Sequence, residues 1–181
     1  MLGKLFGKSG NQAEVSRQGS LHVTGWDAFM ENALTKGDAY IWCSQDINIG
    51  AGGTMLIVRN DSHAQKLVIV RIEVTNGNVA TRYEIHKVTA AYTADDDSAT
   101  EINAGGWGKG APATATADDD GNTQGTVFAE IGAGVAVETY ARDIGMVLNQ
   151  GEAIGVDQVT ESTAGNVTLY GYFIDNEEIG G

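Results

Sequence analysis

Two runs of aspartate, each within the sequence Ala-Asp-Asp-Asp, have the residue type that a hard cation such as calcium prefers. Asp118, Asp120 and Asn122 stand where the first three ligands of an EF-hand calcium loop would stand. The sixth position, where that loop turns on glycine, holds Thr123, and the twelfth, where a bidentate glutamate belongs, holds Ala129. The spacing therefore excludes an EF-hand. It leaves the three residues as candidates for a looser oxygen site, while a solvated, self-repelling loop is the favoured interpretation.

Carboxylates and a cysteine could also do catalytic chemistry. General acid–base catalysis needs two carboxylates at a defined separation, one with a raised pKa, and adjacent aspartates in a polar stretch do not meet that need. The single cysteine, Cys43, lies among large apolar residues, which indicates a buried side chain rather than a nucleophile. Motifs of phosphate loops, dinucleotide folds, zinc proteases and serine hydrolases are missing from the sequence. We therefore expect no enzymatic activity, no catalytic residue and no cofactor.

One large aromatic residue interrupts the polar stretch between the two aspartate runs. Trp107 lies within Gly-Gly-Trp-Gly-Lys-Gly, and glycines on both sides let the backbone approach another surface closely. The ring either anchors the tip of this stretch or faces a partner, and both alternatives stay open. The whole segment, residues 93–124, is rich in Asp, Gly, Thr and Ala, so we predict a long acidic, glycine-rich loop.

The elements that must position these residues are predicted to be strands. Between residues 166 and 175, side chains alternate between two faces and include many β-branched and aromatic residues, as in a β-strand. Turn signals such as Asn76-Gly77 separate further segments of this kind. We predict eight strands, at residues 38–49, 54–59, 66–75, 79–92, 125–131, 135–147, 152–160 and 166–175.

Regularly spaced strands without intervening helices predict an all-β protein, and eight of them fit an eight-stranded antiparallel jelly-roll β-sandwich. A nine-stranded immunoglobulin-like sandwich is the alternative, although its Cys…Trp…Cys spacing is missing. One short helix is expected early in the chain, because apolar residues recur there at intervals of three and four. These residues are Trp26, Phe29, Met30, Ala33 and Leu34. We expect the stripe to pack on the core, with a contact between subunits as the alternative.

The length of 181 residues predicts one folded domain with an N-terminal extension. Residues 1–19 combine glycine and polar residues with three cations and one acid, so we predict a flexible, basic N-terminal arm. Residues 20–181 are predicted to form a single β-sandwich domain that carries the acidic loop. No segment approaches the roughly 20 apolar residues of a membrane span, so no membrane partner is expected.

The formal net charge of −13 is concentrated in the second half of the chain, where residues 88–181 hold sixteen acidic residues and two basic ones. A negative field repels phosphates, so we expect no nucleic-acid partner. The same field suits a basic protein partner or an exterior, solvated face.

The C-terminal third has a distinctive order of elements. An apolar strand ends near Leu148 in a tight turn at Gly151, an Ile-Gly-Val-Asp strand follows at residues 154–157, and an alternating strand closes the pattern at residues 167–173. This order resembles the last strands of virion structural proteins of tailed bacteriophages, of the jelly-roll kind that decorate heads or build head fibres. The resemblance implies a non-enzymatic protein of the capsid exterior, made in the host cytoplasm. It also implies a trimer that clamps neighbouring major capsid subunits.

We therefore predict a capsid decoration, or cement, protein that binds the lattice of the phage major capsid protein and stabilises the head. Its contact with the capsid is expected from apolar and basic residues of the arm, namely Leu2, Lys4, Leu5, Phe6 and Lys8. Trp26 and Phe29 are the candidates for packing between the subunits of a homotrimer.

Two other functions stay open. The first is a carbohydrate- or receptor-binding jelly-roll module of a phage head fibre or tail, with Trp107, Tyr170 and Tyr172 as contacts and the aspartate-rich loop holding calcium. The second is a hydrolase, which would need two carboxylates converging on one concave face of the sandwich.

Overall fold

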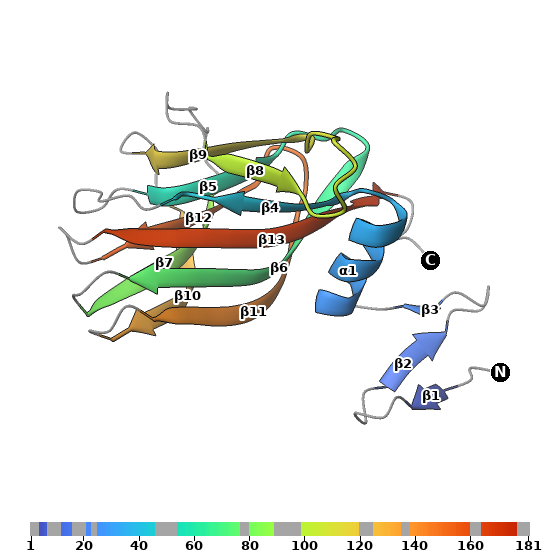
Figure 1. The fold of residues 1–181 in the computed structure, drawn as a ribbon, viewed down its shortest axis with the longest axis horizontal. Helices are drawn as coiled ribbons and strands as arrows, with labels where there is room; N and C mark the ends of the chain where they lie inside the picture. Colours follow the sequence, from blue (N-terminus) through green and yellow to red (C-terminus); the bar gives the residue numbers. More distant parts are fainter. Residues whose placement is uncertain are drawn as a thin grey trace.

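The computed structural model consists mainly of strands in two large antiparallel sheets, with one helix and a small N-terminal sheet (Figure 1). The residues that it describes are 4–6, 12–15, 21–22, 25–45, 54–76, 80–88, 99–119, 125–134, 138–159 and 164–176. For the first three of these segments and for residues 118–119, the description covers the backbone alone.

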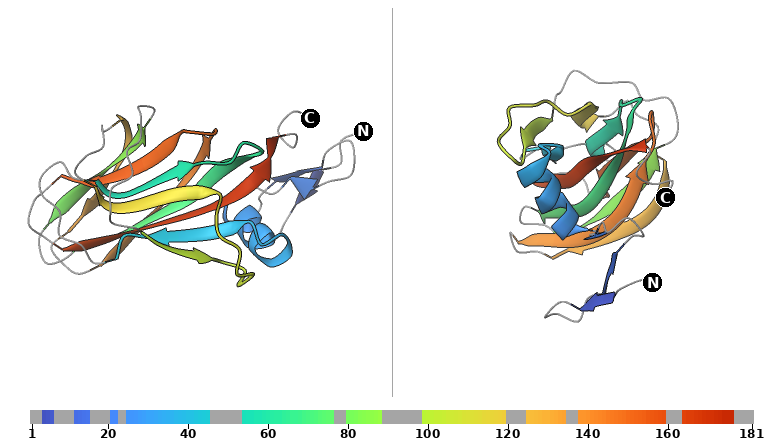
Figure 2. Two further views of the ribbon diagram at one scale, coloured as in Figure 1. Left: turned by 90° about the horizontal axis from the view of Figure 1, so that it is seen from above. Right: turned by 90° about the vertical axis from the view of Figure 1, so that its right-hand side faces the viewer.

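Ten strands form two five-stranded sheets, stacked as two layers (Figures 1 and 2). One sheet has the order β10-β7-β12-β5-β9 and the other the order β11-β6-β13-β4-β8, and every pair of neighbours is antiparallel. The bounds are Ala39–Cys43 for β4, Thr54–Asn60 for β5, Gln65–Asn76 for β6, Thr81–Val88 for β7, Thr100–Asn103 for β8, Ala113–Asp119 for β9, Thr126–Ala133 for β10, Thr139–Leu148 for β11, Ala153–Gln158 for β12 and Gly165–Asp175 for β13.

The all-β class and the sandwich are confirmed, but the count of eight strands was wrong. Each of the eight predicted strands is present, and the described residues add two more, β8 and β9, inside the segment predicted to be a loop. Both extra strands lie at a sheet edge, where β8 pairs with β4 and β9 pairs with β5. An edge strand needs only one backbone partner, so the Thr- and Ala-rich sequence of β9 suffices without an aliphatic run.

The core lies between the two sheets and is contributed by both. It includes fully buried aromatic residues on β4 and β7 and aliphatic residues on β5, β6 and β12. Tyr40 stacks on Trp42 and meets Phe173 edge to face, with ring centroids 5.9 and 5.8 Å apart. Burial of such large side chains supplies the main drive for folding, at about 25 cal/mol for each Å² of apolar surface removed from water.

Strand β6 is apolar on both faces, as its continuous apolar run predicts. Val70 is an extra residue, a bulge, of β6 against β13, where the register shifts between Ile69 and Arg71, and the register against β11 shifts at the same place, where β11 has two residues, Ile144 and Gly145, for this one. On one side of the sheet Ile69 and Ile72 join the core between the layers. On the other side Val70 packs under the helix. The bulge therefore places Val70 and Arg71 next to each other in sequence on the outer side of the sandwich.

The predicted short helix is present as α1, Trp26–Thr35. Its buried face, which includes Phe29 and Ala33, covers the outer side of the β11-β6-β13-β4-β8 sheet, where it contacts β13, β4 and β6. Gly37 lies in the turn directly after the helix, where its backbone has a φ of 68° and its N–H donates to the carbonyl of Asn32 over 2.9 Å. Glycine is the residue that enters this left-handed conformation without a steric cost, so it stops the helix.

A small antiparallel sheet precedes the helix. Its strands are β1 (Lys4–Phe6), β2 (Gln12–Val15) and β3 (Leu21–His22), in the order β1-β2-β3. Figures 1 and 2 show it beyond α1 and outside the sandwich. The described parts of residues 1–19 thus form strand backbone, while the flexibility of the arm stays a prediction.

Candidate functional site

Three of the aromatic residues singled out in the sequence come together on the outer side of the sandwich. Trp26 stacks on Phe29 with ring centroids 5.0 Å apart, and Tyr170 on β13 meets both rings edge to face at 5.3 and 5.9 Å. Phe29 is buried inside the chain, Tyr170 is half-buried and Trp26 is 42% exposed. Trp26 is therefore the member of this cluster that a second molecule can reach. The packing of Trp26 or Phe29 between subunits stays a prediction.

Charged residues border the aromatic cluster. The Arg71 guanidinium lies 5.6 Å from the centre of the Trp26 ring, a cation–π distance. Its Nε lies 2.8 Å from Glu73 Oε1, and its Nη1 lies 3.4 Å from Asp143 Oδ1. The sequence held a signal for this group that was overlooked: Arg71 and Glu73 are two apart on one strand, so they share a face.

The Tyr170 hydroxyl joins this charged group by donating to Glu73 Oε2 over 2.9 Å. Burial, together with the Glu73 carboxylate, raises the pKa of Tyr170 to about 12. The phenol therefore stays protonated at neutral pH and acts as a hydrogen-bond donor. Tyr172, the other tyrosine suggested as a ligand contact, is buried under α1 with Ala28 and Phe29.

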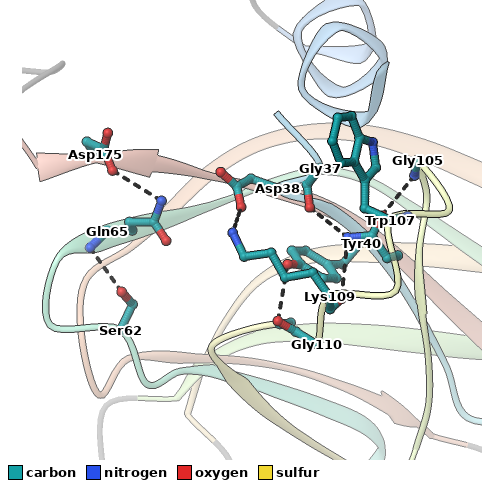
Figure 3. Close-up of polar contacts among 12 residues, drawn as sticks. Gly37, Asp38, Tyr40, Ser62, Gln65, Gly105, Trp107, Lys109, Gly110 and Asp175 are labelled. Atoms are coloured by element: carbon teal, nitrogen blue, oxygen red, sulfur yellow. Dashed lines mark hydrogen bonds and ion pairs between the residues drawn. The ribbon is translucent and has the colours of Figure 1, made fainter. Parts of the chain in front are cut away.

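Trp107 lies against the C-terminal end of α1 (Figure 3). Its indole N–H donates to the carbonyl oxygen of Ala33 over 3.0 Å. Its ring packs on two glycines so closely that a Cβ on Gly105 would lie 2.4 Å from the ring and one on Gly37 would lie 2.7 Å from it. The ring is nevertheless 57% exposed. Trp107 therefore anchors its loop, while its exposed side leaves a contact with a partner as a prediction.

Polar contacts fix the rest of this loop to the turn between α1 and β4 (Figure 3). The Lys109 ammonium forms an ion pair with Asp38, which raises the pKa of Lys109. The Asn103 side chain donates to the carbonyl of Gly37 over 2.6 Å, and the Tyr40 hydroxyl donates to the carbonyl of Gly110 over 3.2 Å. These contacts hold Trp107 in place relative to the helix, because they join the loop to the sandwich on both sides of the ring.

Exposed large apolar residues gather on this side of the sandwich. We call the set the helix-side surface, and its members are Trp26, Met30, Leu34, Ile102 and Trp107. The first three follow one another at intervals of four residues along α1. Ile102 lies on β8 opposite Ile41, which packs on the α1 cluster. Solvent-exposed apolar residues that gather in this way mark contact sites more often than scattered ones do.

A buried ion pair lies in the other sheet. His86 Nε2 is 2.7 Å from Asp157 Oδ2, Nδ1 is 3.1 Å from the carbonyl oxygen of Gly125, and Glu84 lies 3.8 Å away. The Asp157 side chain is the main cause that raises the pKa of His86, against the opposing effect of burial. Both His86 and Asp157 are only 3% exposed. A substrate cannot reach side chains so deeply covered, so we interpret the pair as structural.

The remaining predicted sites concern calcium and the arm. Asp118 belongs to β9, where the structure describes its backbone only, and Asp120 and Asn122 lie outside the described residues. Among the side chains that are described, no three His, Cys, Asp or Glu groups could together hold a metal ion. The helix found within the described ranges is too short and too polar to cross a membrane. The capsid contacts Leu2 and Lys8 lie outside the described residues, while the backbone of Lys4, Leu5 and Phe6 forms β1.

Comparison of the chain with protein-family models, with curated proteins and with solved structures gave no significant match.

Proposed function

We propose that the chain is a jelly-roll decoration protein of tailed-bacteriophage heads that binds the major capsid protein lattice and stabilises the shell. The strand order supports the jelly-roll part of this proposal. When the eight strands predicted from the sequence are numbered along the chain, they run 1-8-3-6 in one sheet and 2-7-4-5 in the other. This order agrees with the two four-stranded sheets expected of a jelly roll, and β8 and β9 extend the two sheets at the edge formed by strands 1 and 2.

The observation that carries the binding role is the helix-side surface. It presents two tryptophan rings that are 42% and 57% exposed, and one of them, Trp107, is held by a hydrogen bond to the helix. Rigid, partly exposed aromatic residues are favoured anchors of protein contacts, since they bury much area and lose little conformational entropy. A cement protein needs such contacts and no active site, and many identical weak contacts across a lattice give strong attachment.

The test uses purified virions and expanded capsids that lack the protein. Mass spectrometry of virions should give hundreds of copies per particle, as lattice decoration requires, whereas a handful would mean a fibre or tail component. A truncation without residues 1–18 should fold, because the described strands of that range, β1 and β2, lie outside the sandwich, yet fail to bind expanded capsids. Unchanged occupancy by the truncated protein would refute the capsid role of the arm, including Leu2, Lys4, Leu5, Phe6 and Lys8.

A carbohydrate- or receptor-binding module remains the second candidate. One observation favours it: half-buried Tyr170 and exposed Trp26 lie in contact beside Arg71 and Glu73, so aromatic faces and planar hydrogen-bonding groups occur together. Sugar-binding sites combine these two kinds of group. A glycan array run with and without a chelator separates the candidates, because a decoration protein gives no signal and a calcium-dependent lectin gives one that the chelator removes.

A further inference from the structure

Helix α1 has two apolar faces, and the sandwich covers only one of them. The covered face includes Ala28, Phe29 and Ala33, which are 2–3% exposed. The second face runs through Met30, 42% exposed, and Leu34, 70% exposed. A helix on the surface of a globular protein normally needs a single apolar stripe, facing the core. The second stripe is therefore a surface available to another partner.

The neighbouring loop enlarges that surface. Trp107 adds an exposed ring at the C-terminal end of α1, where its hydrogen bond to Ala33 fixes it. Ile102, also 57% exposed, adds an aliphatic side chain from the adjoining strand. Five of the nine large apolar side chains that are exposed among the described residues thus belong to the helix-side surface.

The charge beside the stripe is negative. Asp27 and Glu31 are exposed one turn apart on α1, and the helix contains no lysine or arginine. Two of the nearby cations have carboxylate partners, since Arg71 is bound by Glu73 and Lys109 by Asp38, and Lys36, directly after the helix, also takes part in an interaction. An occupant that joins apolar side chains to free positive charge would complement this surface.

The chain itself carries one segment of that kind. Its first eight residues, Met-Leu-Gly-Lys-Leu-Phe-Gly-Lys, contain four large apolar side chains, two lysines and no acid, in a protein whose net charge is −13. Three short strands bury little surface by themselves, so the small sheet that contains β1 needs a surface to pack on.

We propose that the helix-side surface of one copy binds residues 1–8 of a second copy. The small sheet joins the N-terminal end of α1, because β3 ends at His22, four residues before Trp26, and Figures 1 and 2 show it pointing away from the sandwich. Leu34 lies eight residues further along the helix, roughly 12 Å away at 1.5 Å per residue. Strand β1 of the same copy is therefore placed away from Leu34 and Trp107, whereas the arm of a neighbour can approach them.

This contact is head-to-tail, with the arm of each copy on the helix of the next, so it closes into a ring if the rotation between copies allows. It requires no capsid and does not rest on the proposed function, in which the same two surfaces contact the shell instead of a second copy. It also gives Trp26 a role between subunits, through a neighbour's arm rather than a neighbour's helix.

The experiment measures self-association of the purified full-length chain by sedimentation velocity over a range of concentrations. Leu34→Asp should weaken association at least tenfold, and it should leave the fold intact because Leu34 is 70% exposed. The matched control is Val159→Asp, an exposed apolar residue of the other sheet, 40% exposed, which should associate like the unchanged chain. A full-length chain that stays monomeric, or a Leu34→Asp variant that associates unchanged, overturns the proposal.

A complementation experiment identifies the occupant. A chain without residues 1–8 keeps its helix-side surface but lacks the arm, and the Leu34→Asp chain keeps the arm but lacks the surface. Each alone should be monomeric, and an equimolar mixture should form a one-to-one complex and nothing larger. The charge-reversed arm Lys4→Glu/Lys8→Glu should weaken association of the full chain, and adding Glu31→Lys should restore part of it. Failure of the mixture to form a complex overturns the exchange of arms.

Discussion

The indole N–H of Trp107 donates a hydrogen bond to the carbonyl oxygen of Ala33, 3.0 Å away, across 74 positions of sequence. This bond satisfies one of the carbonyls that a helix leaves unpaired at its C-terminal end. It also joins the β8–β9 loop to α1, which turns two surface segments into one rigid unit.

Removing the Trp107 indole is expected to loosen this unit. Trp107→Ala should lower the free energy of unfolding by about 1–3 kcal/mol, because it removes a hydrogen bond worth about 1 kcal/mol and the packing of a half-exposed ring. Trp107→Phe keeps most of the packing and loses only the N–H, so it should cost about 1 kcal/mol. Urea unfolding followed by circular dichroism measures both values. Equal stability of all three chains would mean that the ring contributes nothing to the fold.

Gly37 makes a separate prediction about the same unit. A Cβ at Gly37 would lie 2.7 Å from the Trp107 ring, and the backbone there has a φ of 68°. Gly37→Ala therefore combines a backbone penalty of about 1 kcal/mol with a steric clash, and we expect a total loss of about 2–4 kcal/mol. Gly106→Ala is the matched control, because Gly106 has a φ of 70° and open space around it. Comparison of the two unfolding curves isolates the contact with Trp107.

Much of the fold could be predicted from the sequence because period two is a local signal. The alternation in β13 and the apolar run in β6 indicated strands correctly, and the three- and four-residue spacing around Phe29 indicated α1. Strands β8 and β9 lacked this signal. Their positions depend on backbone pairing with β4 and β5 and on contacts such as that of Glu101, which accepts from the Trp42 indole over 3.1 Å.

The candidate surface was only partly predictable, since its members meet through long-range packing. The sequence singled out Trp26, Phe29 and Tyr170 for different reasons, and nothing in their spacing indicated that the three rings touch. The spacing of Arg71 and Glu73 indicates a shared face, but which face that is depends on the bulge at Val70, which exists only where β6 pairs with its neighbours. Local patterns therefore predict the elements, while the site depends on how the strands pair.

The contact between Tyr170 and Glu73 predicts an unusual titration. Because the folded pKa of Tyr170 is raised to about 12, above the ordinary value of 10, its contribution to stability is complete below pH 10 and is lost as the pH rises toward 12. Glu73→Gln removes the neighbouring carboxylate, so the Tyr170 pKa should fall toward 10. NMR of ring-labelled tyrosine in the pH range 9–12 measures it, with Tyr170→Phe assigning the signal. An unchanged Tyr170 pKa in Glu73→Gln would leave burial as its sole cause.

The buried pair His86–Asp157 predicts how stability depends on pH near neutrality. His86 Nδ1 lies 3.1 Å from the Gly125 carbonyl, which only accepts, and Nε2 lies 2.7 Å from the Asp157 carboxylate, so the positive, doubly protonated imidazolium is the form that suits both neighbours. Glu84, 3.8 Å away, adds a second negative charge. A control pair lies nearby, where Lys87 Nζ on β7 is 2.8 Å from Glu152, the residue before β12, and is partly exposed.

A histidine whose folded pKa exceeds its unfolded value of about 6.5 contributes stability that is complete below that pH and is lost as the pH rises through the folded pKa. The free energy of unfolding should therefore fall as the pH is raised from 6 to 9. Breaking the pair with Asp157→Asn should cost about 3–5 kcal/mol at pH 6 and flatten this dependence, because one buried partner is then left uncompensated. Lys87→Met should cost no more than about 1 kcal/mol at either pH, as a partly exposed pair does. Urea unfolding of the unchanged chain and of the two variants at pH 6 and at pH 9 measures the loss of stability that each variant causes at each pH. Stability that rises with pH in the unchanged chain would show that His86 is buried in its neutral form.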